Sequence, residues 1–134
     1  MNKILILLFL LLPFKSLSQG YKYFNKSHDQ IVKTLNLNKN IEIMEDYPDY
    51  IHAVDDVKLN NLIFYLRDDK CYEVRTTYQK ENDYDKVSNY LDVVYIKDEE
   101  NVWHFDFDSG RQITYLQKKP GFFVTKDIFV PKEK

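Results

Sequence analysis

The chain has little of the residues that mark special structural classes. A single cysteine among 134 residues excludes a fold stapled by disulfides within the chain, and 3 glycines with 4 prolines argue against a collagenous or low-complexity protein. Neither sign of charge dominates, since 19 basic and 21 acidic residues give a formal net charge of -2, so we expect no nucleic-acid binding. The composition therefore predicts one small globular domain.

Long apolar runs are absent except at the N-terminus, where residues 4–12 are all apolar. Ser16 and Ser18 then stand at the -3 and -1 positions of a cut after Ser18, as in a secretory signal peptide. The run would span only about 14 Å as a helix, too short for a bilayer, and no cysteine follows it for lipid attachment. The sequence predicts a signal peptide over residues 1–18 and an exported, periplasmic or secreted domain over residues 19–134, without a stable membrane anchor after cleavage.

Two helices are predicted from capping residues and apolar spacing. Ser27, with the glutamine three residues on, fits a capping box that starts a helix over Ser27–Asn36. Asn82 or Asp83 can cap a second helix over Asp83–Tyr95. The expected buried faces consist of Ile31 and Leu35 in the first helix and of Tyr84, Val87, Leu91 and Val94 in the second.

Alternating aromatics predict a hairpin between Trp103 and Tyr115. A three-residue loop, 108–110, would put the aromatics and an isoleucine on one face and Gly110 at a left-handed position. This register pairs Phe107 with Arg111, Phe105 with Ile113, and Trp103 with Tyr115. Shorter strands are expected over Ile41–Met44 and Tyr50–Val54, and a final strand over Phe122–Val130.

A second hairpin is predicted over Leu62–Tyr78 by the same face argument. Its loop would be residues 68–70, with Leu66 opposite Tyr72, Phe64 opposite Val74 and Leu62 opposite Thr76. As the single cysteine of the chain, Cys71 is expected to be a small buried residue. The predicted hairpin register, however, would turn its side chain away from the main core.

These elements predict an α+β fold in which two short helices pack on one face of a mainly antiparallel sheet. The helices also correspond at an offset of 56 residues, for example Ile31 with Val87, which suggests two related αββ halves. The layout resembles small exported modules of the β-lactamase-inhibitor and outer-membrane assembly-factor type. It departs from the assembly factors by lacking their Gly-x-Pro turn after the first helix and their lipid-attachment cysteine. A cystatin-like or nuclear-transport-factor-like sheet is a competing fold.

Few residues indicate chemistry. The three histidines are spread over different elements without a metal-ligand spacing, so we expect no metal and no cofactor. His104 and Asp106 share one strand face, which leaves a small hydrolase or ligand-binding sheet domain with a polar site there as the alternative function. No nucleophile motif or phosphate-binding glycine loop is present, and we expect the chain not to be an enzyme.

Charge is unevenly distributed along the chain. The net charge is +3 over residues 19–41, -11 over residues 42–110 and +4 over residues 111–134. The acidic segment also carries tyrosines, which offer broad contact area together with a hydroxyl group. We expect an exported, non-catalytic module that binds a protein partner of basic character or an envelope component, with an immunity or inhibitor protein as one variant. The expected partner-binding residues are Glu45, Asp46, Tyr47, Asp49, Tyr50, Asp55 and Asp56.

Overall fold

The computed structural model describes residues 20–133, so the predicted signal peptide lies outside the described residues. The elements in chain order are α2 (Gly20–Tyr23), α3 (His28–Asn36), β1 (Ile41–Tyr47), β2 (Tyr50–Asp55), β3 (Asn60–Arg67), β4 (Lys70–Tyr78), the 3₁₀ turn η1 (Glu81–Asp83), α4 (Tyr84–Val94), β5 (Ile96–Glu99), β6 (Val102–Phe107), β7 (Gly110–Lys119) and β8 (Phe122–Pro131). In this range, no helix is long and apolar enough to cross a membrane.

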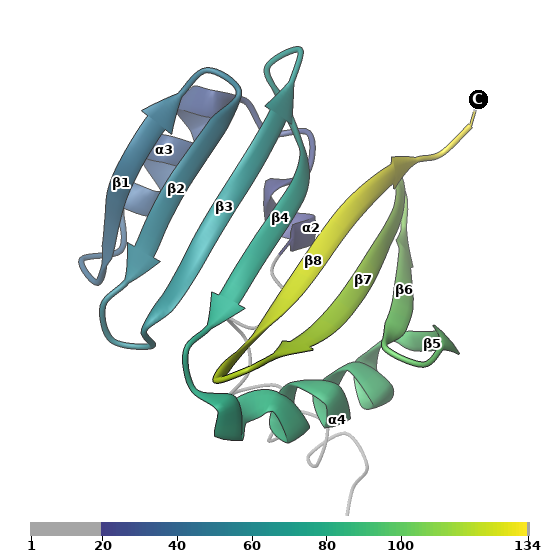
Figure 1. The fold of residues 1–134 in the computed structure, drawn as a ribbon. Helices are drawn as coiled ribbons and strands as arrows, with labels where there is room; N and C mark the ends of the chain where they lie inside the picture. The colour runs from purple at the N-terminus through teal and green to yellow at the C-terminus, as the bar shows by residue number, and fades with distance from the viewer. Residues whose placement is uncertain (1–19, 134) are drawn as a thin grey trace, which may run out of the picture.

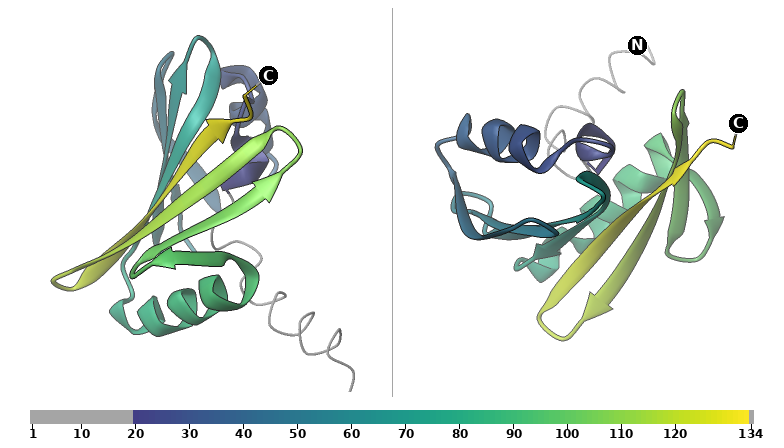
Figure 2. Two further views of the ribbon diagram at one scale, coloured as in Figure 1. Left: turned by 90° about the vertical axis from the view of Figure 1, so that its right-hand side faces the viewer. Right: turned by 90° about the horizontal axis from the view of Figure 1, so that it is seen from above.

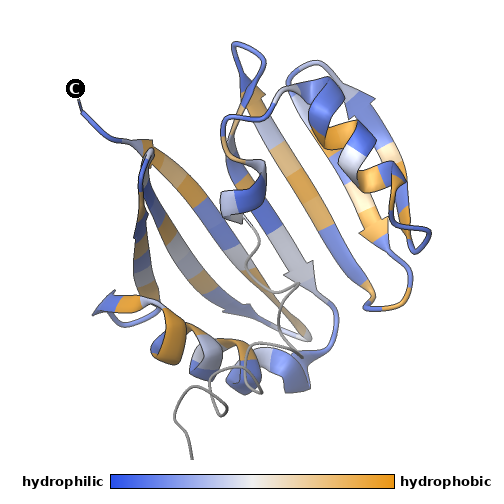
Figure 3. Ribbon diagram, turned by 180° about the vertical axis from the view of Figure 1, so that it is seen from behind, coloured by the Kyte–Doolittle hydropathy of each residue, from blue (hydrophilic) through white to orange (hydrophobic). Residues whose placement is uncertain are grey.

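Eight antiparallel strands form one open sheet in the order β1-β2-β3-β4-β8-β7-β6-β5 (Figure 1). Helices α3 and α4 pack on the same face of this sheet, which Figure 3 shows from the helix side. The predicted α+β class, with two short helices on one face of an antiparallel sheet, is confirmed. Strands β1 and β5 form the two edges, whereas the C-terminal strand β8 lies inside the sheet.

The two halves of the sheet have the same order of elements, a helix followed by four strands (Figure 1). The repeating unit is therefore longer than the predicted αββ. The offset is 56 residues between Ile31 and Val87 in the helices, but 52 residues between the turns at Asp68 and Pro120. Strands β4 and β8 join the halves, and the sheet twists strongly across this junction (Figure 2).

Each helix covers a hydrophobic core of its own. Under α3 the fully buried side chains include Ile31, Leu35, Ile51 and Phe64. Under α4 they include Val87, Leu91, Trp103, Leu116 and Phe123. The predicted buried positions Ile31, Leu35, Val87 and Leu91 are thus confirmed, because the helical spacing depends only on the local sequence.

The two helices begin in different ways. Ser27 is the N-cap of α3 and forms the predicted capping box with Gln30. Asp83 holds the N-cap position of α4, but its side chain makes no capping hydrogen bond. The predicted N-cap position is therefore confirmed at Asp83, but the expected capping hydrogen bond is absent, because the 3₁₀ turn η1 leads directly into α4 and leaves the Asp83 backbone helical.

The β6–β7 hairpin has a two-residue turn, Asp108–Ser109, instead of the predicted three-residue loop. Phe107 pairs with Gly110, Phe105 with Gln112 and Trp103 with Thr114. The shift of one residue places polar Gln112 and Thr114 on the core side, and Ile113 and Tyr115 on the other side. The left-handed conformation predicted for Gly110 is also wrong, since Gly121 is the glycine with positive φ in the described chain.

The β3–β4 hairpin keeps the predicted pairs Phe64–Val74 and Leu62–Thr76, but its end differs. Asp68 and Asp69, both with positive φ, form a two-residue turn, and a bulge between Tyr65 and Leu66 pairs Leu66 with Cys71 rather than Tyr72. Cys71 therefore points into the core and is fully buried. The prediction that this register turns it away from the core is wrong, because an extra residue at a bulge inverts the alternation beyond it.

Candidate functional site

Five of the seven predicted partner-binding residues gather at the tip of the β1–β2 hairpin. Glu45 is the centre of a polar network there: it accepts a short hydrogen bond from the Tyr50 hydroxyl, and its other oxygen lies 3.3 Å from the His52 ring. The Tyr50 contact lowers the pKa of Glu45 and raises that of Tyr50 to about 12. Tyr47 stacks on Tyr50 with ring centroids 5.2 Å apart and is 50% exposed.

Asp46 has a structural partner. The His28 Nε2 atom makes a short contact with Asp46, and the His28 backbone N–H donates to Asp69 at 3.0 Å. These contacts tie the start of α3 to two hairpin turns. Burial lowers the pKa of His28, but hydrogen bonds with Asp46 and Asp29 outweigh it, so the pKa is raised.

Asp55 and Asp56 lie at the opposite end of β2, one strand length from the hairpin tip. Asp55 is 8% exposed, and its carboxylate accepts the backbone N–H groups of Val57 and Lys58, both at 3.0 Å. It therefore stabilises the β2–β3 turn. The seven predicted residues do not form one surface, because the length of β2 lies between the hairpin tip and the two aspartates.

The sheet face opposite the helices is turned toward the viewer in Figure 1. The strand registers place two rows of side chains on this face, and each row crosses six strands. One row consists of Tyr50, Tyr65, Glu73, Ile128, Ile113 and His104. The other consists of His52, Ile63, Arg75, Lys126, Tyr115 and Val102. Most of these side chains are half-buried, and no described helix lies over them. We call these twelve residues the helix-free face.

Cations lie over aromatic rings on this face. The Arg75 guanidinium is 4.9 Å from the Tyr65 ring centroid, and the Lys126 ammonium is 5.7 Å from that of Tyr115. Arg75 also donates to Glu73 at 2.5 Å. The Tyr65 ring is 6.5 Å from Tyr50, so the aromatic series continues to the hairpin tip. These contacts restrain tyrosine and arginine side chains, which are the types that contribute most at protein interfaces.

His104 and Asp106 share one face of β6 as predicted and lie within ion-pair distance, but each has a closer partner. His104 is 8% exposed and its Nδ1 lies 2.7 Å from Asp98, while its Nε2 is 3.9 Å from Asp106. Asp106 instead accepts two hydrogen bonds from Arg111, at 2.6 and 3.1 Å, which lower its pKa. The missed partner Asp98 lies on β5, a strand that the sequence analysis did not predict.

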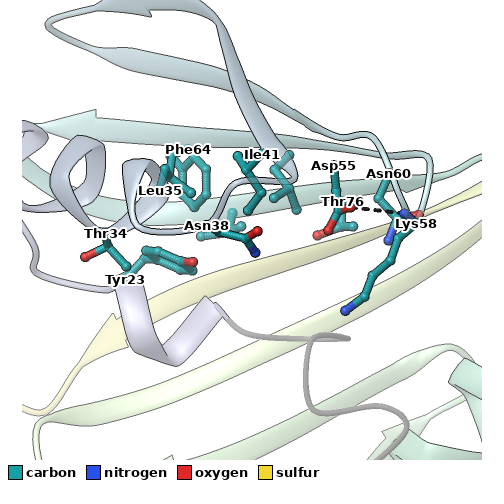
Figure 4. A pocket seen from close by; sticks show the side chains of 12 residues that line it. Tyr23, Thr34, Leu35, Asn38, Ile41, Asp55, Lys58, Asn60, Phe64 and Thr76 are labelled. Carbon is teal, nitrogen blue, oxygen red and sulfur yellow. Dashed lines mark hydrogen bonds between the residues drawn. The ribbon is translucent and has the colours of Figure 1, made fainter.

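A cavity of about 200 Å³ lies between α3 and the first half of the sheet (Figure 4). One end is apolar, with Leu35 and Phe64, and the other is polar, with Asp55, Asn60 and Thr76. Its volume is below the usual range of ligand pockets, about 300 to 1,000 Å³. Among residues 20–133, no group of three or more metal-ligating side chains is present.

A buried carboxylate is the feature that the sequence analysis missed. Asp127, on β8, is 1% exposed, and one of its oxygens accepts a hydrogen bond from the Thr114 hydroxyl at 2.7 Å. Burial raises its pKa to about 7, against the opposing effects of Thr114 and the Gly20 backbone. Asp127 lies in the same every-second-residue series as the buried residues Phe123, Thr125 and Phe129. This periodicity was the sequence signal that could have placed Asp127 on the buried face.

Comparison with known proteins gives no match: no family model fits this chain, and no curated protein or solved structure is detectably similar to it.

Proposed function

We propose that this chain is an exported, non-catalytic protein that binds a partner protein through its helix-free face and the adjoining tip of the β1–β2 hairpin. The observation that carries the proposal is the row of tyrosines with Arg75 and Lys126 on a sheet face that no described helix covers. Tyrosine and arginine give the largest contact energies at protein interfaces, and contacts within the face limit the entropy lost on binding.

Charge at the hairpin tip indicates the character of the partner. Glu45 and Asp49 are exposed beside the face, and the contact with Tyr50 keeps Glu45 ionised. A partner with basic side chains opposite the tip would be attracted and oriented there. The C-terminal strand β8 offers no free edge to a partner, because it is hydrogen-bonded to β4 and β7. The free strand edges belong to β1 and β5.

Affinity capture from an envelope extract, followed by calorimetry with the purified captured protein, tests the proposal. We expect Y65A and Y115A, one from each half of the face, each to weaken binding by roughly tenfold or more. The matched control is Y21A, because Tyr21 is 49% exposed but belongs to α2, on the helix side of the sheet. Equal binding by Y65A, Y115A and the unaltered protein would remove the face from the proposal.

The acidic tip is tested separately with D49N. Asp46 and Asp55 are unsuitable for this test, because Asp46 contacts His28 and Asp55 stabilises the β2–β3 turn, so their replacement would also alter the fold. We expect D49N to slow association at low salt and to leave dissociation nearly unchanged, as for a charge at the rim of an interface. The control is D56N, an exposed carboxylate at the other end of β2. If the captured protein is an enzyme or toxin, its activity in the complex tests the immunity or inhibitor variant: we expect the bound chain to inhibit it.

A further inference from the structure

Two cations lie side by side at the centre of the helix-free face. Arg75 on β4 pairs directly with Lys126 on β8, where the two halves of the sheet join (Figure 1). Like charges that face each other across neighbouring strands repel, so this pairing destabilises the free protein. A negative charge placed next to the pair would relieve the repulsion.

The face supplies a carboxylate to only one of the two cations. Glu73, 8% exposed, accepts the Arg75 Nε–H group at 2.5 Å. Lys126 lies over the Tyr115 ring, but within residues 20–133 it makes no ion pair with a carboxylate. Two cations and one carboxylate leave a surplus of one positive charge, because an aromatic ring attracts an ammonium without neutralising it.

Both cations are accessible to an approaching group. The Arg75 side chain is 43% exposed, and its guanidinium has further N–H groups besides the one that Glu73 accepts. The Tyr65 ring beside Arg75 and the Tyr115 ring beside Lys126 stand on either side of the pair. A carboxylate placed between the two cations would therefore be bound by charge and by hydrogen bonds from both.

We infer that Arg75 and Lys126 bind one acidic side chain, Asp or Glu, of the partner protein, and that Tyr65 and Tyr115 pack against the residues beside it. The inference rests on the proposed function and adds the chemistry of the partner's central contact. A side chain of a protein is favoured over a small free anion, because the two tyrosines offer broad contact area that a free anion would leave uncovered.

The strand registers also give the spacing of the partner's charges. Glu45 on β1 pairs with His52, and the same row continues through Ile63 to Arg75 and Lys126. Neighbouring strands are about 4.8 Å apart, so roughly 15 to 20 Å separates the acidic tip from the cation pair along this row. A matching partner presents a basic group and an acidic group at about that spacing, which fixes its orientation on the face.

The test uses calorimetry with the purified protein captured from the envelope extract. We expect K126E, which turns the attraction into repulsion, to weaken binding by at least about tenfold. The matched control is K118E, because Lys118 also lies over a tyrosine ring, 5.2 Å from the centroid of Tyr84, but Tyr84 belongs to α4 on the helix side of the sheet. This control should bind within about twofold of the unaltered protein.

Charge reversal on the partner identifies the acidic residue. Each Asp and Glu of the captured protein is replaced by Lys in turn, and we expect one such replacement to restore the affinity lost in K126E. The same replacement should weaken binding to the unaltered chain, because it places a third cation against Arg75 and Lys126.

The melting temperature of the free protein is a second readout. K126Q removes the like-charge contact together with one cation–π contact, whereas K118Q removes a cation–π contact alone. We therefore expect K126Q to melt at or above K118Q. A markedly lower melting temperature for K126Q would show that Lys126 is already compensated within the chain, and this result would overturn the inference.

The outcomes distinguish this inference from the proposed function. If K126E binds as tightly as the unaltered protein while Y65A and Y115A bind more weakly, the face is the interface but the acidic contact is wrong. The acidic contact is also wrong if no replacement on the partner restores binding of K126E. If all three variants bind like the unaltered protein, or if the unaltered chain retains no protein, both proposals fail.

Discussion

At the residue scale, Cys71 shows how burial controls reactivity. Its side chain is fully buried, and its S–H group donates to the Glu73 carbonyl at 3.6 Å. Burial raises the pKa of this thiol to about 12, so almost no thiolate forms near neutral pH. We expect iodoacetamide to leave the folded protein unlabelled at mildly alkaline pH and to label it fully in concentrated urea, as measured by mass spectrometry. Rapid, complete labelling of the folded protein would contradict the assigned β3–β4 register.

His28 gives a pH-dependent contribution to stability. Its folded-state pKa is raised, so the protonated ring is favoured in the folded protein relative to the unfolded chain. This stabilisation is fully present below the unfolded pKa, about 6.5, and is lost as the pH rises through the folded value. We expect the urea midpoint of the unaltered protein to exceed that of H28N by more at about pH 5.5 than at about pH 8.5. D46N should show a similar loss of pH dependence, since it removes the main partner.

At the scale of elements, Gly110 tests the β7–β8 contact. A Cβ atom there would lie 2.3 Å from the Val130 carbonyl oxygen and 2.8 Å from the Phe129 ring, so alanine must push the two strands apart. We expect G110A to lower the free energy of unfolding by about 1 to 3 kcal/mol, measured by urea titration. The control is G121N, at a left-handed position with nothing within 4 Å, where asparagine is tolerated at a cost below about 1 kcal/mol. Equal losses in the two variants would show that the contact with β8 is not tight.

The hairpins show what element-scale reasoning misses. Alternation correctly placed Trp103, Phe105 and Phe107 on one side of β6, but it could not give the partner residues on β7. The predicted three-residue loop would pair apolar residues with apolar residues across the two strands. The actual two-residue turn shifts the pairing by one position, so that Trp103 lies opposite Thr114. The polar side chains of β7 are accommodated inside because Gln112, Thr114 and Asp127 bond with one another.

At the scale of the whole molecule, the question is whether the two halves unfold as one unit. The six residue pairs from Glu73–Ile128 to Tyr78–Phe123 join them through continuous hydrogen bonding. We expect L35A, in the core under α3, to cost about 2 to 5 kcal/mol and to shift the fluorescence transition of Trp103, which lies in the other core. Leu37, 81% exposed, provides the matched control L37A, which should leave the midpoint unchanged. An unshifted Trp103 transition in L35A would show independent halves.

The helix-free face also exists only at this scale. Tyr50 and Tyr65 belong to the consecutive strands β2 and β3, whereas Tyr115 lies on β7 in the other half, and only the strand order and registers bring all three onto the same face. The sequence analysis found the tyrosines of the hairpin tip because they are neighbours along the chain. It also grouped them with Asp55 and Asp56, which are near in sequence. An extended strand, however, places residues at its two ends far apart in space.

The sequence by itself determined the local features: the capping box of α3, the buried faces of both helices and the alternation that makes each strand two-sided. These depend on residues within a few positions of one another, so their periods can be read along the chain. Only the tertiary structure decided the hairpin registers, the burial of Cys71, the partners of His104 and the position of Asp127 under Gly20. Those outcomes depend on turns, a bulge and contacts between distant segments, where a shift of one residue changes which side chain faces the core.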